Sequence, residues 1–369
     1  MVLKNKLSER NIFLDIVKYY AIFLVVWGHV VAQTSHFATY PVQEDAMVRL
    51  IYTTHMPLFM GICGYFFFKS ISKYSSTLEY IQKKLPKRLL GLLIPMLSFG
   101  VIKTVCIQFF ASNHPTSVIA LLKMVVGNAK GVWFLGDLAV NTILVLIAWH
   151  FCVREFQHDW KYFLIVLPLS LIPVITYQNP QMYVFFVAGF WIAAYVEKDV
   201  LVKAASYWKA IAGIFVVAYL LFSYMPWPSE DFRYNFHEQS LFQLAVNDGL
   251  KFVLGFAGSF VSLALIHKYM TLLNGTWLYH RATVEGRFTL DIYLLQIVVV
   301  EIIGSHLHKL WLSHGDIDIF YLGGGIGRLI IPFLVTCIFM EIIVWISKEI
   351  NARPILSKIL FYRLKLRSC

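Results

Sequence analysis

The stretch IFLDIVKYYAIFLVVWGHVVAQ, residues 12–33, decides the fold class of this chain. Its residues are apolar apart from a few polar positions, and a helix of about 20 mostly apolar residues crosses a lipid bilayer. A short basic segment with Lys4, Lys6 and Arg10 precedes it, and no small-residue cleavage site follows. We therefore expect a retained first membrane span rather than a cleaved signal peptide.

Nine further apolar stretches follow along the chain, separated by segments rich in charge, proline and asparagine. Only 14% of all residues are charged and 59% are hydrophobic, whereas soluble domains carry about a quarter charged residues. This composition excludes a soluble globular protein and predicts an all-α polytopic membrane protein with about ten transmembrane helices. The expected spans are 12–33, 47–69, 89–111, 133–153, 162–178, 182–197, 207–225, 249–267, 288–307 and 322–347.

The distribution of basic residues predicts the orientation. The side that holds both termini carries 23 Lys and Arg residues and the opposite side carries seven, among them Lys103 and Lys251. Cytoplasmic loops carry the excess of basic residues, so we expect both termini in the cytoplasm. This orientation accounts for most of the net charge of +11, so we expect no nucleic-acid partner. Residues 1–347 are expected to form the membrane domain, and 348–369 a basic cytoplasmic tail on the anionic inner leaflet.

Three ionisable residues lie within the first span: Asp15, Lys18 and His29. Lys18 and His29 are 11 residues apart and so share one helix face, with a rise of about 16 Å between them. Asp15 lies one turn before Lys18 and can neutralise it. One explanation of these residues is a functional site, because an ionisable group inside the bilayer raises the free energy of insertion and is kept where it has a function. An ion pair at the interface, with Lys18 reaching towards water, and a histidine bonded to a neighbouring helix explain them equally well.

Further polar residues lie in other spans and predict a shared polar interior. For Glu301 and Glu341 we expect a role in tying helices together. The five cysteines have neither disulfide-framework nor zinc-site spacing, so no metal site is expected. The other polar residues in the spans are His55, Asp137, Asp291, Gln296 and Arg328.

The segment from Asp15 to His29 resembles the start of the acyltransferase 3 family of integral-membrane acyltransferases. The family has an arginine, ten intervening residues and a histidine in its first span, and Lys18 and His29 hold that spacing. Later blocks of the family match in the same order: His55-Met-Pro-Leu-Phe, Lys87-Arg88, Trp133-Phe-Leu, Gly189-Phe-Trp and Thr289-Leu-Asp-Ile-Tyr293-Leu-Leu-Gln296.

The resemblance implies transfer of an acyl group, usually acetyl from cytoplasmic acetyl-CoA, to a hydroxyl of a cell-surface polysaccharide or lipid-linked sugar. It implies a location in the bacterial inner membrane, acetyl-CoA as cosubstrate and no tightly bound cofactor. Membrane lipids and polysaccharide-assembly proteins are the other expected partners. Imidazole is the natural base for activating a hydroxyl. We expect His29, Lys18 and Asp15 to be catalytic, and Arg88, Lys87 and Lys84 to bind the CoA phosphates. The residues expected to line the polar interior or bind the acceptor are His55, Trp133, Asp137, Asp291, Tyr293, Gln296 and Arg328.

Two other functions remain open from the sequence. A secondary transporter or flippase for a polar solute would also have buried charges, although no matching pair of Gly/Pro-broken spans is visible in the two halves. A non-catalytic partner in polysaccharide assembly would have a polar interior and no use for acetyl-CoA. The outer loop 226–244 could bind sugar through its aromatic residues or belong to an interfacial aromatic belt.

Overall fold

The computed structural model describes residues 12–35, 46–110, 117–155, 181–225, 240–313 and 324–363. These residues form helices joined by turns, and no strand occurs among them. The all-α polytopic membrane class predicted from the sequence is confirmed.

Seven helical stretches of the described chain are long and apolar enough to cross a bilayer. They correspond to predicted spans 12–33, 47–69, 89–111, 133–153, 249–267, 288–307 and 322–347. In the structure these are α1 (Ile12–Ser35), α2 (Ala46–Ile71), α4 (Leu85–Phe110), α6 (Trp133–Glu155), α11 (Leu241–Leu273), the run of α13 (Thr289–Gln296), η3 (Ile297–Gly304) and α14 (Ser305–Ser313), and α15 (Gly324–Ala352).

The remaining helices are shorter, and among the described residues they raise the number of spans to eight at most, compared with the ten predicted. Two of them, α9 and α10, make an eighth span if the bend of 64° between them lies within one crossing. Helix α8 fills the predicted range 182–197 with only 14 residues, about 21 Å of helix, which is less than the apolar core of a bilayer. The predicted span 162–178 lies outside the described residues. The short helices are α3 (Thr77–Lys83), α5 (Val118–Lys130), α8 (Met182–Tyr195), α9 (Lys198–Ala205), α10 (Trp208–Ser223), α12 (Trp277–Glu285) and α16 (Pro354–Phe361).

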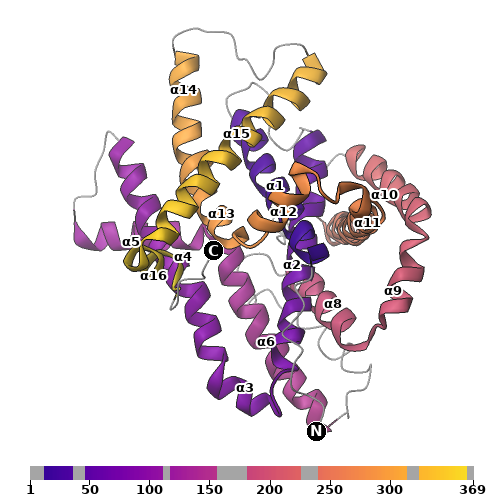
Figure 1. Cartoon of the computed structure of the whole chain (residues 1–369). Helices are drawn as coiled ribbons and strands as arrows, with labels where there is room; N and C mark the ends of the chain where they lie inside the picture. The colour runs from indigo at the N-terminus through magenta and orange to yellow at the C-terminus, as the bar shows by residue number, and fades with distance from the viewer. Residues whose placement is uncertain are drawn as a thin grey trace.

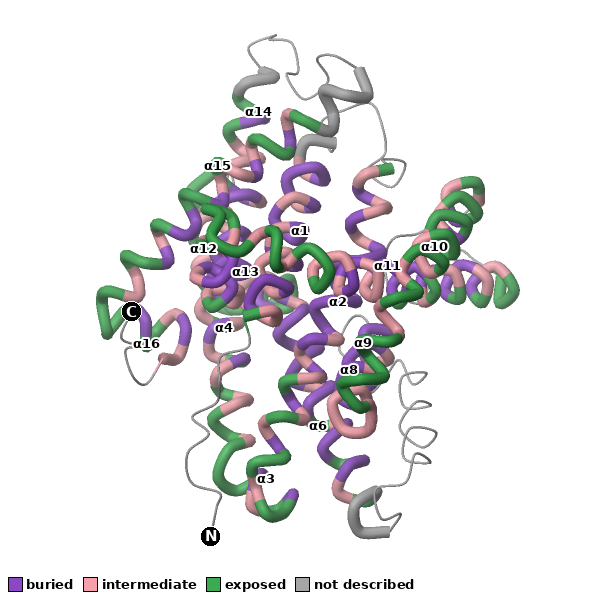
Figure 2. The backbone as a smooth tube through the Cα atoms, turned by 45° about the vertical axis from the view of Figure 1, so that its right-hand side comes forward, coloured by how far each residue is buried: buried purple, intermediate pink, exposed green. Residues whose placement is uncertain are grey.

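Helices α1 and α2 form the centre of the bundle, as Figure 1 shows, with α9, α10 and α11 to one side and α4, α5 and α16 to the other. Helix α1 is mostly apolar and packs against several other helices, as is typical of a helix that is surrounded by protein. Its Val17, Ala21 and Val25 are at most 2% exposed. Buried residues gather along α1, α2 and α13 in Figure 2, whereas exposed residues are frequent along α10.

Glycines allow α2 and α8 to pack with their backbones in contact. A Cβ atom on Gly64 would overlap the carbonyl oxygen of Phe186, and one on Gly189 would overlap that of Gly61. Small residues spaced along membrane helices permit such close approach. This contact fixes α8 against the central helix although α8 is short.

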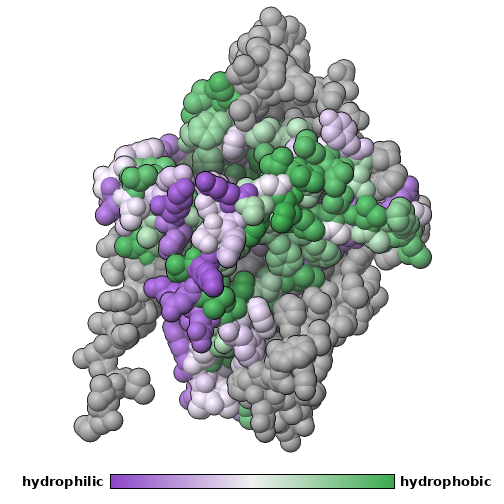
Figure 3. Space-filling model, turned by 90° about the vertical axis from the view of Figure 1, so that its right-hand side faces the viewer, coloured by the Kyte–Doolittle hydropathy of each residue, from purple (hydrophilic) through white to green (hydrophobic). Residues whose placement is uncertain are grey.

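The side of the molecule that carries α9, α10 and α11 presents a broad hydrophobic area (Figure 3). Ile214, Val217 and Leu221 of α10 lie at helical spacing and are each more than half exposed. Apolar exposure of this extent is unusual for a soluble monomer. These side chains are positioned to contact the acyl chains of lipids.

Helix α3 lies in the predicted cytoplasmic loop 69–88 and is stabilised at its start by side chains. The Glu79 amide donates to Ser76 Oγ at 3.1 Å, and Glu79 Oε2 accepts from the Ser75 amide at 2.9 Å. Lys83 Nζ lies 2.8 Å from Glu79 Oε1. Hydrogen bonds from Lys83 and Ser75 lower the pKa of Glu79 to about 2.

The C-terminal segment packs against the bundle. The rings of Phe361 and Phe99 stack with centroids 6.0 Å apart, and Ser98 Oγ donates to the Ile359 carbonyl at 2.9 Å. Arg363 forms an ion pair with Asp291, whose side chain is fully buried. Residues 348–352 belong to α15, so this part of the predicted tail is helical and continuous with a membrane helix.

Candidate active site

His29 lies near the end of α1 and faces the π-helical segment η3. Its Nδ1 atom is 3.4 Å from Oε1 of Glu301, and the two side chains are 25% and 18% exposed. An imidazole whose Nδ1 faces a carboxylate keeps its Nε2 available for another partner. This is the arrangement that orients a histidine for proton transfer.

Glu301 is shared by three helical segments. Its Oε2 atom lies 3.1 Å from Nζ of Lys103 on α4, and its Oε1 atom accepts a hydrogen bond of 3.3 Å from Nε2 of Gln296. Gln33 lies one turn after His29 on α1, and its Oε1 atom accepts a hydrogen bond of 2.6 Å from Ser305 Oγ at the start of α14. The expectation that Glu301 ties helices together is therefore consistent with these contacts, and the carboxylate also contacts His29.

The π-helical geometry of η3 explains how Gln296 and Glu301 meet. Residues five apart point in different directions on an α-helix, whereas a π-helix closes its turns by i→i+5 bonds and brings them to the same side. Single π-helical turns recur at functional sites. Ile297–Gly304 is the only such segment among the residues that the structure describes, and Glu301 lies within it.

Aromatic and imidazole rings continue this cluster onto α2. The Tyr52 ring lies between two histidines, with centroids 6.2 Å from His29 and 5.1 Å from His55. His55 is 2% exposed, and its Nδ1 lies 2.6 Å from the Ile51 carbonyl oxygen. Because a carbonyl only accepts, Nδ1 is the protonated nitrogen and Nε2 has the free lone pair.

Tyr293, Asp137 and Trp133 lie beside the same cluster. The charges of Glu301 and Asp137 both act on the Tyr293 hydroxyl, and the Tyr293 ring lies 5.3 Å from that of Phe134. Trp133 contacts Phe134 at 6.2 Å between ring centroids. Asp137 is 2% exposed. Three residues that were expected to line a shared polar interior thus lie close to Glu301 or to one another: Asp137, Tyr293 and Gln296.

Lys18 and Asp15 lie at the opposite end of α1, separated from His29 by about 16 Å of helix rise. Lys18 Nζ is 2.7 Å from Asp15 Oδ1 and 5.4 Å from the centre of the Phe66 ring. The structure therefore brings Lys18 and Asp15 together and holds them apart from His29.

Arg88 on α4 lies close to the end of α2 that carries Phe66 and Phe67. Its guanidinium is 4.8 Å from the centre of the Phe67 ring, and its Nε donates to Thr142 Oγ1 at 3.3 Å. Cys63 lies within electrostatic range of both Arg88 and Lys18. The side chains of Lys84 and Lys87 are exposed on the surface of the protein. The predicted donor-binding residues thus comprise one partly buried cation and two exposed ones.

Asp291 lies apart from the His29 cluster although it was expected in the same interior. It accepts from Ser347 Oγ at 2.7 Å and from Asn351 Nδ2 at 2.8 Å, in addition to its ion pair with Arg363. Its contacts hold α13, α15 and the C-terminal segment together. The side chain of Arg328 and loop residues 226–239 lie outside the described part of the chain.

Two lysines that the charge count placed on the side opposite the termini lie inside the bundle, Lys103 partly buried and Lys251 fully buried. Lys103 contacts Glu301, and its position within the apolar range 89–111 was the signal that could have identified it. Lys251 is 1% exposed and pairs with Asp248 at 2.8 Å, while Gln181 Nε2 donates to the other oxygen of Asp248 at 2.7 Å.

Within the described ranges, no group of three or more His, Cys, Asp or Glu residues is placed to hold a metal ion.

Comparison with known proteins identifies the family. The sequence model of a family described as an acyltransferase domain matches residues 11–347. Nodulation protein NolL of Sinorhizobium fredii (strain NBRC 101917 / NGR234) is 27% identical over 306 residues, which cover 78% of each chain. Nodulation protein NolL of Mesorhizobium japonicum (strain LMG 29417 / CECT 9101 / MAFF 303099) is 25% identical over 302 residues, which cover 78% of this chain and 76% of that protein. No solved structure matches significantly. Because the family model spans nearly the whole bundle, the chain belongs to the acyltransferase 3 family and is an integral-membrane acyltransferase.

Proposed function

We propose that the chain is an O-acetyltransferase that moves acetyl from cytoplasmic acetyl-CoA to a hydroxyl of a cell-surface polysaccharide or lipid-linked sugar in the bacterial inner membrane. The contact of His29 with Glu301 carries this proposal, because it supplies an oriented imidazole inside a membrane acyltransferase. Membership of the family supports acyl transfer, and the nature of the acyl group and acceptor is our inference.

In this proposal His29 is the general base. Glu301 holds the Nδ1 side of the imidazole, and Nε2 takes the proton of the acceptor hydroxyl. The hydroxyl oxygen then bonds to the carbonyl carbon of the thioester, the carbon–sulfur bond breaks, and the leaving CoA thiolate takes the proton back from the His29 imidazolium. Lys103 balances the negative charge of Glu301 while the proton is transferred.

The cationic end of the bundle is proposed to bind the donor. Arg88 and Lys18 would contact the CoA phosphates, with the exposed Lys84 and Lys87 attracting them. CoA carries its thioester at the end of an extended pantetheine arm, remote from its phosphates. The separation of about 16 Å along α1 between Lys18 and His29 therefore suits a donor whose charged and reacting ends are far apart.

The direct test measures transfer of labelled acetyl from acetyl-CoA to glycan in membranes that contain this protein alone. We expect His29→Ala and His29→Gln to lose a factor of about 10² to 10⁴ in rate, the usual contribution of a positioned base. His267→Gln is the matched control, because His267 packs edge-on against Phe13 and not against the cluster. Folded His29 variants with wild-type rates would refute the role of His29, and wild-type protein that transfers no acetyl would refute the proposed reaction.

A further inference from the structure

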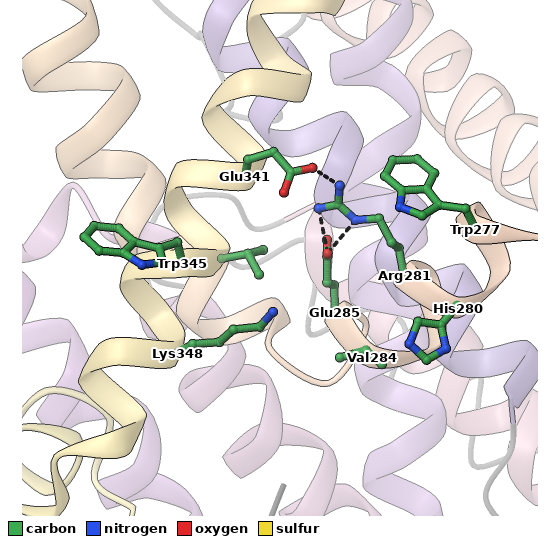
Figure 4. A pocket seen from close by; sticks show the side chains of 9 residues that line it. Trp277, His280, Arg281, Val284, Glu285, Glu341, Trp345 and Lys348 are labelled. Atoms are coloured by element: carbon green, nitrogen blue, oxygen red, sulfur yellow. Dashed lines mark hydrogen bonds and ion pairs between the residues drawn. The ribbon is translucent and has the colours of Figure 1, made fainter.

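A pocket with a volume of about 410 Å³ lies between α12 and the last turns of α15, outside the cluster around His29. Helix α12 packs against the beginning of α1, where Gly286 leaves no room for a side chain against the Asp15 carbonyl. The pocket thus lies at the end of the bundle where α1 begins. Its lining residues are Trp277, His280, Arg281, Val284, Glu285, Glu341, Val344, Trp345 and Lys348 (Figure 4).

Arg281 occupies the middle of the pocket between two carboxylates, as Figure 4 shows. Its Nη2 lies 2.6 Å from Glu285 Oε1, and its Nη1 pairs with Glu341. Glu285 is only 4% exposed, and its Oε2 atom has no hydrogen-bond partner among the described residues. Burial raises the pKa of Glu285, and Arg281 and Lys348 oppose that shift. A buried carboxylate oxygen without a donor is costly, so this atom points to a ligand that carries N–H groups.

Lys348 supplies a second cation to the pocket. In Figure 4 its amine points towards Glu285, and its charge acts on the Glu285 carboxylate. The side chain is exposed, and the described residues give it no hydrogen bond or ion pair. The pocket therefore offers a carboxylate oxygen and an ammonium group that have no hydrogen-bond or ion-pair partner among the described residues.

The pocket opens onto an apolar stripe of the membrane helix α15. Ile338, Ile342 and Trp345 lie at positions i, i+4 and i+7 and are 59%, 39% and 63% exposed. Trp277 is 70% exposed, and the Arg281 guanidinium lies 4.7 Å from the centre of its ring. Exposed tryptophans are typical of the boundary between lipid and water. The stripe is placed to contact an acyl chain whose headgroup enters the pocket.

The charges determine which headgroup fits. Arg281 and Lys348 balance Glu285 and Glu341, so the pocket carries no excess positive charge that would favour CoA phosphates or another polyanion. We propose that it binds the headgroup of phosphatidylethanolamine, with the ammonium donating to Glu285 and the phosphate contacting Lys348. Phosphatidylcholine has no N–H group to donate to Glu285, and phosphatidylglycerol has no cation.

Lipid binding tests this proposal in detergent-purified, delipidated protein. The lipids are phosphatidylethanolamine, phosphatidylcholine and phosphatidylglycerol of identical acyl chains, and the readouts are native mass spectrometry and the rise in thermal midpoint that a ligand of the folded state causes. We expect tightest binding of phosphatidylethanolamine, weakened about tenfold or more by either Glu285→Gln or Lys348→Met, since each removes a charged partner. Glu349→Gln, an exposed neighbour of Lys348 that does not line the pocket, should bind like wild type.

Equal binding of the three lipids, or tighter binding of phosphatidylglycerol, would overturn the proposal. Binding of phosphatidylethanolamine to Lys348→Met as tight as to wild type would also overturn it, and this variant remains informative if Glu285→Gln does not fold. Water-soluble glycerophosphoethanolamine distinguishes the source of the headgroup. Binding as tight as that of the lipid would assign the pocket to a soluble ligand and refute a membrane-lipid site.

Discussion

Replacing Glu301 by Gln isolates the role of its charge in the candidate active site. The amide keeps the shape of the side chain and can still accept a hydrogen bond from His29. It no longer neutralises Lys103, whose Nζ lies 3.1 Å from Glu301 Oε2. Glu301→Gln therefore changes two quantities, the rate of transfer and the free energy of unfolding, for different reasons.

The two effects can be estimated separately. Breaking a buried ion pair costs about 3–5 kcal/mol in stability, and exposed pairs contribute about 1 kcal/mol or less. Lys103 and Glu301 are 19% and 18% exposed, so we expect an intermediate loss of about 1–3 kcal/mol. A histidine base that loses its orienting carboxylate costs a factor of about 10² to 10⁴ in rate. That factor corresponds to about 3–5 kcal/mol in the activation free energy.

The double variant Lys103→Met/Glu301→Gln distinguishes the two roles. Removing the unpaired ammonium should restore the thermal midpoint and leave the transfer rate as low as in Glu301→Gln. Glu349→Gln, an exposed carboxylate on α15, controls for the chemical change alone. If the double variant regained both stability and wild-type activity, Glu301 would serve only to neutralise Lys103, and its proposed action on His29 would be refuted.

Three further predictions concern other parts of the bundle. Arg88→Gln should raise the KM for acetyl-CoA more than it lowers kcat, while Lys209→Gln, at an exposed lysine of α10, should change both little; equal KM values in steady-state assays would remove Arg88 from the donor site. Gly189→Ala should lower the thermal midpoint by forcing α8 away from α2, and unchanged stability would contradict the backbone contact. Helix α3 should lose its cap as the pH falls from the ordinary pKa of Glu79 towards its lowered value of about 2, because the fold stabilises the ionised carboxylate. Amide hydrogen exchange of residues 77–83 measures this loss. In Glu79→Gln the same amides should exchange rapidly at every pH.

The fold class could be predicted because membrane insertion depends on local composition. A run such as residues 12–33 is apolar enough to identify a span without knowledge of its neighbours. The predicted range 182–197 ends two residues after α8 does, next to the charged residues Glu197, Lys198 and Asp199. The bend between α9 and α10 could not be predicted in this way, because hydropathy does not show where backbone hydrogen bonding is interrupted.

The candidate site could be predicted only in part. Helical spacing placed Lys18 and His29 on one face of α1, but a shared face does not bring two residues 11 positions apart into contact. The contact between His29 and Lys103 through Glu301 depends on which helices are neighbours, and a single sequence does not contain that information. The meeting of Gln296 with Glu301 also depends on the π-helical turn, which residue periodicity does not reveal.

The ion pair between Asp291 and Arg363 has a consequence for biosynthesis. Asp291 leaves the ribosome 72 residues before the arginine that neutralises it, so α13 is synthesised while its buried carboxylate has no cationic partner. The last contacts of the bundle form only after the C-terminal segment has docked beside α4 and α15. Completion of the membrane helices during translation is therefore coupled to the final residues of the described chain, and nascent chains that end before residue 363 should be recognised by membrane proteases as unassembled.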